Sequence, residues 1–214
     1  MDKKIALVDD HTIMRSALGG FLNGASGYVV HFEAGSKEEL LAKLQWEQKP
    51  EVILMDYGLG KDVGSDCISE VRKTYGEDIG IIGLSMHQDP LIIQEMITAG
   101  ANGYLFKGTD TKEMLVAIDN VIDHGFYINK FTRSMVFGRS TGEDSNNSIK
   151  LNEVECNIIR LICEEKGNDV IAETLELSPN TVHTYRKRIL KKAQCKNTAG
   201  LVVFAIRHKI FEIS

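Results

Sequence analysis

The sequence predicts an α/β domain with a doubly wound, parallel, five-stranded sheet, followed by a small all-α domain. Over residues 1–122, short runs rich in Ile, Val and Leu alternate five times with longer amphipathic runs. After residue 148, every periodic segment has helical spacing. Between the two regions, residues 138–148 contain no apolar residue, which is typical of a linker. Five strand–helix alternations favour a parallel sheet with right-handed crossovers.

The first region contains five expected strands and five expected helices. Near-continuous apolar runs, such as Val52 to Met55, are typical of strands covered by helices on both faces. Ser36 and Glu39 have the spacing of a capping box before the second helix. A further short helix is expected within residues 126–137. The strands are expected at residues 4–8, 28–32, 52–55, 79–84 and 102–106, and the helices at 12–24, 36–46, 64–74, 88–99 and 111–123.

The second region predicts a helix-turn-helix. Asn152 and Glu155 form a cap pair for its first helix, and a short helix is expected over 169–175. Ser178 is expected to cap a helix that Pro179 begins and that runs to residue 193. This helix carries five of the eight basic residues between 177 and 211. Thr198 is expected to cap a last helix through residue 208. The apolar side of that helix either forms part of a dimer interface or covers the three-helix core, and the sequence leaves both open.

Composition excludes several classes of protein. The longest purely apolar run, 201–206, is far shorter than the roughly 20 residues of a membrane helix. The N-terminus has too short an apolar stretch for a signal peptide. The four cysteines lack any C-x-x-C spacing, so neither a disulfide scaffold nor a zinc finger is expected. We therefore expect a reduced, cytoplasmic protein with no membrane partner.

The net charge of −5 conceals two regions of opposite sign. Residues 1–122 carry a net charge of −8, whereas residues 149–214 carry +3. Between 177 and 211 there are eight Lys or Arg residues and no Asp or Glu. An acidic first domain and a locally basic second domain indicate different partners, and the basic one is compatible with nucleic acid.

Chemically active side chains follow four of the expected strands in the first domain. In an open parallel sheet, ligands bind beyond the carboxyl ends of the strands. With the strand order 2-1-3-4-5, these side chains would share one cavity. Three carboxylates there repel one another, and a hard divalent cation such as Mg²⁺ would relieve that repulsion. The side chains are Asp9 and Asp10 after the first strand, Asp56 after the third, Ser85 after the fourth and Lys107 after the fifth.

This set of groups suits the transfer of a phosphoryl group. A metal ion, an ammonium group and a hydroxyl can surround its equatorial oxygens while a carboxylate lies in line. Asp56 is the natural nucleophile because it follows the central strand of the sheet.

The motifs resemble those of two-component response regulators of the NarL/FixJ group. Residues 1–122 resemble a receiver domain, which has a flavodoxin-like fold, and residues 149–214 resemble a LuxR-type helix-turn-helix domain. We divide the chain into a receiver at 1–124, a linker at 125–147 and a DNA-binding domain at 148–213, with its scaffold and recognition helices at about 168–193. The motifs are Val8-Asp9-Asp10-His11, Ile53-Leu54-Met55-Asp56, Leu84-Ser85-Met86-His87, the segment from Gly100 to Lys107, Leu177-Ser178, Thr181-Val182 and Arg186-Lys187-Arg188-Ile189.

The resemblance implies a role for each matching residue of the receiver. Asp56 would accept a phosphoryl group from a sensor histidine kinase. Asp10, Asp56 and the Gly58 carbonyl would hold Mg²⁺, with Asp9 acting mostly through water. Lys107 would bind the phosphoryl oxygens, while Ser85 and Tyr104 would move in response. Gly60 stands where the family usually has proline, so that turn is expected to be more mobile.

The helix that begins at Pro179 would be the recognition helix that contacts DNA. His183, Thr184 and Lys187 share one face and are expected to read bases, whereas the other basic residues are expected to contact phosphates. A helix-turn-helix of this size usually binds as a dimer, so a homodimer on double-stranded DNA is expected. The expected phosphate contacts are Arg186, Arg188, Lys191 and Lys192.

Two other function classes compete with a phosphorylation-switched transcription regulator. Aspartate-nucleophile phosphatases also place Asp after the first strand, but they typically need Asp-x-Asp, whereas this chain has adjacent Asp9 and Asp10. An interaction module that is never phosphorylated would keep only the fold. Because any phosphotransfer and hydrolysis by the receiver would be side activities, we do not expect an enzyme.

Overall fold

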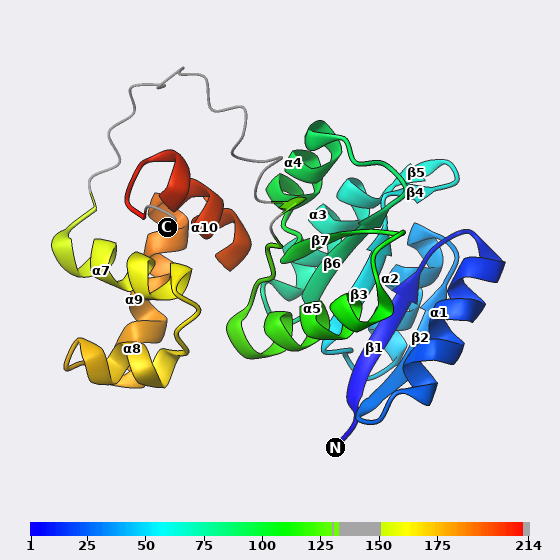
Figure 1. The fold of residues 1–214 in the computed structure, drawn as a ribbon, viewed down its shortest axis with the longest axis horizontal. Coiled ribbons are helices and arrows are strands. Elements are labelled where there is room, and N and C mark those ends of the chain that lie inside the picture. Colours follow the sequence, from blue (N-terminus) through cyan, green and yellow to red (C-terminus); the bar gives the residue numbers. More distant parts are fainter. Residues whose placement is uncertain (130, 133–150, 212–214) are drawn as a thin grey trace.

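The computed structural model describes residues 1–129, 131, 132 and 151–211. The expected linker at 138–148 lies outside the described residues, and so do residues 130 and 133–137 of the segment in which a short helix was expected. The described part forms an α/β region and a helical region that stand side by side (Figure 1). None of the helices in that part is both long enough and apolar enough to cross a membrane.

The α/β region is a five-stranded parallel sheet in the predicted strand order. The order across the sheet is β2-β1-β3-β6-β7, which matches 2-1-3-4-5 when the strands are counted along the chain. The fold class is therefore confirmed. The elements are β1 Lys3–Val8, α1 Thr12–Gly24, β2 Tyr28–Ala34, α2 Lys37–Trp46, β3 Val52–Asp56, α3 Gly64–Tyr75, β6 Gly80–Ser85, α4 Pro90–Ala99, β7 Gly103–Phe106 and α5 Thr111–His124.

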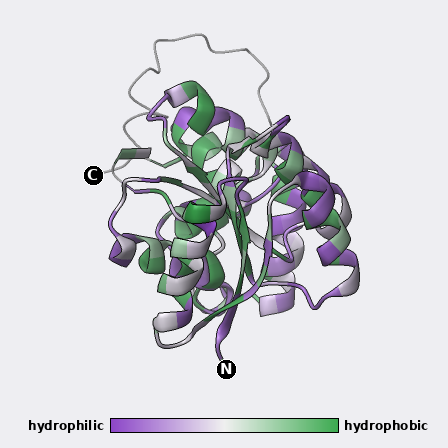
Figure 2. Cartoon of the chain, turned by 90° about the vertical axis from the view of Figure 1, so that its right-hand side faces the viewer, coloured by the Kyte–Doolittle hydropathy of each residue, from purple (hydrophilic) through white to green (hydrophobic). Residues whose placement is uncertain are grey.

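Helices cover both faces of the sheet because its side chains alternate between the two. In β1, Ile5 and Leu7 pack toward α1 and α5, whereas Ala6 and Val8 pack toward α2, α3 and α4. All five residues of β3 are buried. The middle of the sheet is accordingly hydrophobic, while the helices carry hydrophobic and hydrophilic segments in turn (Figure 2). This packing fixes the strand ends and therefore the side chains that follow them.

A two-stranded hairpin after β3 was not predicted. It pairs β4, Gly58–Leu59, with β5, Asp62–Val63, in antiparallel orientation. Gly60 lies in its turn with φ +62°, a value that the ring of proline excludes. This chain therefore has a turn beside Asp56 that proline at position 60 could not form, and the greater mobility expected of that turn stays a prediction.

The helical region packs four helices around one core. Asn152 and Glu155 form the predicted capping box at α7, and Val182 and Ile189 of α9 are fully buried. The cap of α10 is a correction. Asn197, not Thr198, caps that helix, and its side-chain oxygen accepts a hydrogen bond from the Gly200 amide over 2.9 Å. The helices are α7 Glu153–Cys163, α8 Asn168–Thr174, α9 Pro179–Lys192 and α10 Thr198–Arg207.

Candidate functional site

The carboxyl edge of the sheet gathers the polar side chains that the sequence placed after separate strands. Asp56 is the last residue of β3 and Ser85 the last of β6, while Asp9 directly follows β1. These three residues are at least 96% withdrawn from solvent. Burying unpaired carboxylates is unfavourable, so the arrangement requires a compensating positive charge.

Lys107 supplies that charge from the end of β7. Its Nζ lies 2.7 Å from Asp9 Oδ2 and 2.8 Å from Asp56 Oδ2, and the lysine side chain is only 5% exposed. Burial raises the pKa of the Asp56 carboxyl, and the hydrogen bond from Lys107 opposes that rise. Burial acts to lower the pKa of Lys107, but the two carboxylates outweigh it and raise that pKa. The lysine therefore stays protonated between two acidic groups.

Three carboxylates around one ammonium group leave excess negative charge. Oxygen atoms of Asp9, Asp10 and Asp56, with a ring nitrogen of His11, all lie within 4.8 Å of one another. Carboxylate oxygens at this density are the ligands that a hard divalent cation takes. A side chain at Gly58 would meet no heavy atom within 4 Å, so the backbone beside Asp56 is open. These residues fit the magnesium site that the sequence predicted.

Ser85 and Tyr104 are joined through the segment that follows β6. The Ser85 hydroxyl accepts a hydrogen bond from the His87 amide over 3.0 Å, and the Tyr104 hydroxyl donates one to the His87 carbonyl. Tyr104 is fully buried, and this burial raises the pKa of its hydroxyl. A movement of Ser85 toward Asp56 would therefore pull on the same backbone segment that holds Tyr104.

Helix α9 presents one face to solvent and the opposite face to the core. Ser178 caps it by accepting a hydrogen bond from the Thr181 amide over 3.1 Å, and Pro179 occupies its first turn. His183, Thr184 and Lys187 are exposed together on one side of the helix. This is the face that the sequence assigned to base reading.

The basic residues of α9 differ in their surroundings. Arg186 donates to Asn168 Oδ1 over 2.7 Å and to Thr198 Oγ1 over 2.9 Å. Arg188 and Lys192 both contact the fully buried Glu155, at 3.0 Å and 2.8 Å. The sequence identified Glu155 as a capping residue but not as the partner of these cations, because nothing in the local pattern links residues so far apart. Lys191 is exposed.

The comparisons with known proteins agree with both halves of this description. The family model for the response regulator receiver domain matches residues 5–119. The model for bacterial regulatory proteins of the luxR family matches residues 150–205. The chain belongs to the response regulators with a LuxR-type DNA-binding domain.

Relatives of this response regulator match along nearly their whole length. Response regulator GacA of Pseudomonas syringae pv. syringae (strain B728a) is 31% identical over 213 residues, which cover 99% of each chain. Oxygen regulatory protein NreC of Staphylococcus carnosus (strain TM300) is 29% identical over 217 residues, covering 98% of this chain and 99% of NreC.

Solved structures support the fold assignment. The structure of the two-component response regulator RcsB in complex with DNA has a TM-score of 0.58 at 18% identity, covering 95% of this chain and 98% of that one. A LuxR-family response regulator from Aurantimonas sp. SI85-9A1 has a TM-score of 0.56 at 27% identity, covering 63% of this chain and 95% of that one. The RcsB structure shares the fold over nearly the whole chain, and the Aurantimonas structure shares it over the 63% that it covers.

In this response regulator, the receiver contacts the LuxR-type domain at the end of α4. Asn197 is fully buried, and its Nδ2 donates a hydrogen bond to the Gly100 carbonyl over 2.5 Å. The same carbonyl also accepts a hydrogen bond from Nε of the buried Arg72 over 2.8 Å. Lys196 Nζ lies 3.4 Å from the Ala99 carbonyl. The receiver thus offers two backbone carbonyls at this contact, and its own buried Arg72 holds that of Gly100 in place.

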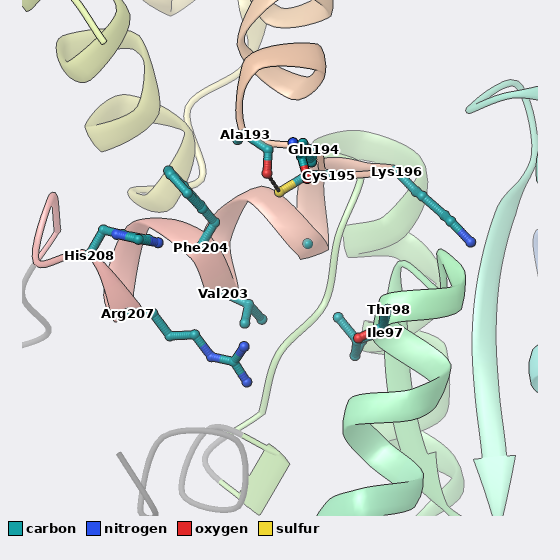
Figure 3. A pocket seen from close by; sticks show the side chains of 11 residues that line it. Ile97, Thr98, Ala193, Gln194, Cys195, Lys196, Val203, Phe204, Arg207 and His208 are labelled. Atoms are coloured by element: carbon teal, nitrogen blue, oxygen red, sulfur yellow. Dashed lines mark hydrogen bonds between the residues drawn. The ribbon is translucent and has the colours of Figure 1, made fainter. Parts of the chain in front are cut away.

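A cavity of about 230 Å³ lies beside this contact. Ile97 and Thr98 of α4 form one wall, and Val203 and Arg207 of α10 extend toward them (Figure 3). Helix α10 is therefore placed between the core of its own domain and the receiver. The sequence left two roles open for the apolar side of this helix. The structure shows that it covers the core formed by the other three helices. Its role in dimerisation stays a prediction.

Glu77 brings a receiver carboxylate close to α9. It lies in the loop between α3 and β6 and remains in contact with solvent. Crowding by protein atoms raises the pKa of its carboxyl, while the positive charges of Arg186, Arg72 and His183 act to lower it. The receiver thus places negative charge near the helix face that would approach DNA.

The contacts of Glu155 lead to a prediction about stability. Replacing Glu155 with Gln removes the charge that faces Lys192 and Arg188, and the free energy of unfolding of the helical domain should fall by about 2 kcal/mol, as for loss of a hydrogen bond to a charged group. Hydrogen exchange of amides in α7 and α9 of the full chain measures this. The exposed Glu153 on the same helix gives the matched control, Glu153→Gln, which should have little effect.

The effect of Glu155→Gln should depend on pH. Burial acts to raise the pKa of Glu155, but the hydrogen bonds from Lys192 and Asn152 outweigh it, and the pKa lies below the ordinary value of 4.5. A carboxyl with a lowered pKa stabilises the folded state above its unfolded pKa, and this contribution is lost as the pH falls through the folded pKa. The difference between wild type and variant should therefore shrink on acidification below 4.5. An unchanged difference would contradict the ion pair.

Proposed function

We propose that this response regulator is a transcription regulator switched by phosphorylation of Asp56, with a sensor histidine kinase as phosphoryl donor. The observation that supports this most strongly is the placement of Asp56 beside Lys107, with Asp9 and Asp10 at the same edge of the sheet. Proteins with an aspartate and a lysine in this relation can form and stabilise an acyl phosphate.

The proposed transfer joins an Asp56 oxygen to phosphorus and breaks the bond from phosphorus to the imidazole nitrogen of the donor, which leaves with the electron pair. Lys107 lies close enough to Asp56 to donate to the phosphoryl oxygens. Asp10, Asp56 and the Gly58 carbonyl would hold Mg²⁺, and Asp9 would act through water. When bound, this cation supplies positive charge for the oxygens of the transferring group.

The switch follows from the contacts of Ser85. A phosphoryl group on Asp56 offers a strong acceptor, so the Ser85 hydroxyl would turn toward it and away from its present position beside His87. Tyr104 donates to the same His87 backbone and would move with it. Because this segment leads into α4, the movement reaches the helix whose end holds Asn197.

The consequence for DNA binding lies in the contact between the domains. Asn197 holds α10 against α4, and Glu77 stands near α9 in the same arrangement. A DNA phosphate approaching α9 would meet that carboxylate. We infer that phosphorylation loosens the contact. This would move Glu77 away from the exposed face of His183, Thr184 and Lys187, which could then approach the major groove, and would free α10 for dimerisation on two half-sites.

The DNA-binding part is tested by selecting sites from a random pool of double-stranded DNA. The full-length protein is used with and without acetyl phosphate and Mg²⁺. The treated protein should enrich one motif made of two half-sites about 10 base pairs apart, and the untreated protein should enrich it less. Failure to enrich any motif in either condition would contradict the proposal and favour a module that does not bind DNA.

The contact between the domains gives a second prediction. In Asn197→Asp, the side-chain oxygen can still cap α10, but the donor to the Gly100 carbonyl is replaced by a carboxylate that repels it. The unphosphorylated variant should bind the selected DNA about tenfold more tightly than the wild type, the equivalent of a buried hydrogen bond worth about 1.4 kcal/mol. Fluorescence anisotropy measures both affinities.

The matched control for Asn197→Asp is Asn180→Asp, which changes the same side chain at an exposed position at the start of α9, away from the Gly100 carbonyl. That variant should bind DNA no more tightly than the wild type. Equal affinities of Asn197→Asp and the wild type would show that the contact does not restrain DNA binding.

A further inference from the structure

His11 lies among the carboxylates of the phosphorylation site, although the proposed function gives it no role. Its Nδ1 is 2.9 Å from Asp10 Oδ1, 3.2 Å from Asp9 Oδ1 and 3.9 Å from Asp56 Oδ2. His11 is also the N-cap residue of α1, but its side chain makes no capping hydrogen bond to that helix. The imidazole is therefore directed to the carboxylates rather than to the helix.

The distances from the His11 nitrogen to the three carboxylates are compatible with one coordination sphere. Ligand atoms bound at about 2.0–2.2 Å lie roughly 3 Å apart when adjacent and roughly 4.2 Å apart when opposite. The two shorter distances from the His11 nitrogen, 2.9 and 3.2 Å, correspond to adjacent ligands. The third, 3.9 Å, approaches the separation of opposite ligands. The imidazole is 70% exposed, so it can adjust its position.

The mixture of donors decides which cation the cluster favours. Mg²⁺ takes oxygen ligands and retains much of its water, so a nitrogen ligand adds little to its binding. An imidazole beside carboxylates suits borderline first-row ions, whose affinity for nitrogen and oxygen sites rises from Mn²⁺ toward Cu²⁺. Lys107 contacts Oδ2 of both Asp9 and Asp56. Asp9 Oδ1 accepts a hydrogen bond from the His11 amide over 2.8 Å and, as a carboxylate oxygen, has a further lone pair for a cation.

We propose that His11 is a metal ligand that makes this centre bind a borderline transition-metal ion, of the Fe²⁺, Co²⁺, Ni²⁺ or Zn²⁺ class, more tightly than Mg²⁺. The inference rests on the metal site of the proposed function and adds a ligand and a selectivity to it. A bound transition ion would occupy the same carboxylates as Mg²⁺ and would compete with it.

The test uses Co²⁺ as the probe on the full-length, unphosphorylated protein. Calorimetry gives the affinities for Co²⁺ and Mg²⁺, and proton NMR detects the strongly shifted ring N–H signal of an imidazole bound to Co²⁺. His11→Asn, which retains a good helix cap, should lose that signal. Its Co²⁺ affinity should fall at least about tenfold, because loss of a mere hydrogen-bond partner of a metal ligand can already lower metal affinity by that factor. Its Mg²⁺ affinity should change little.

Two further variants identify the site. His87→Gln alters an exposed histidine on the neighbouring segment after β6 and should keep both the signal and the affinity. Asp10→Asn should weaken both metals. Two outcomes would show that His11 is not a ligand while leaving the metal site itself intact. In the first, Co²⁺ binding depends on Asp10 but gives no shifted imidazole signal. In the second, His11→Asn binds Co²⁺ at least as tightly as the wild type. If neither metal binds, both the inference and the proposed metal site fail.

Discussion

Asp56→Asn is expected to take up no phosphoryl group from acetyl phosphate and Mg²⁺, whereas the wild type takes up one. The amide is nearly the same size as the carboxylate but has no nucleophilic oxygen and does not bind a divalent cation well. The fold should persist, because Lys107 keeps its 2.7 Å contact with Asp9. Intact-mass spectrometry of the two proteins after the same incubation measures the difference directly.

The control for this variant is Asp66→Asn, which removes an exposed carboxylate from the first turn of α3. It should gain the phosphoryl mass to the same extent as the wild type. An adduct on Asp56→Asn as large as that on the wild type would place the acceptor elsewhere. No adduct on the wild type would favour a module that is never phosphorylated.

Replacing His183, Thr184 and Lys187 together with Ala is expected to remove sequence-specific DNA binding. The three residues share the exposed face of α9, and each base contact is worth about 1–3 kcal/mol. Their combined loss should reduce the affinity for the selected DNA by about a hundredfold or more. The affinity for random DNA should change much less, since phosphate contacts dominate it. Competition between the two DNAs in an anisotropy assay measures the ratio.

Lys191→Ala provides the comparison, because this exposed lysine is expected to contact phosphate. It should weaken binding to selected and random DNA equally, and should reduce the slope of log affinity against log salt by about one. If the triple variant lost affinity for selected and for random DNA equally, the three residues would contact the DNA backbone and would not read bases.

The sheet and its edge could be predicted because they depend on local pattern and on one general rule of topology. The apolar run from Val52 to Met55 is buried on both faces. The doubly wound strand order predicted which strands lie beside it in the sheet. The hairpin at Gly58 could not be predicted, since two-residue strands leave no periodicity to detect. The positive φ of Gly60 is a conformation that proline could not adopt.

The site could be located from the sequence, but the contacts of its cations could not. Adjacency at the ends of parallel strands predicted that Asp56 and Lys107 would lie together. For α9, the sequence treated Arg186 and Arg188 as equivalent surface cations, although Arg186 binds Thr198 and Arg188 binds Glu155. These pairings join different helices, and only the three-dimensional packing brings them together. The Asn197 contact with the receiver is of the same kind.

The central claim is that the phosphorylation state of Asp56 controls DNA occupancy. Genome-wide footprinting in cells that carry either the wild type or Asp56→Asn, at matched protein levels, tests it most directly. Sites that the wild type occupies under activating conditions should be largely unoccupied in the variant. Identical occupancy by the two proteins would contradict it.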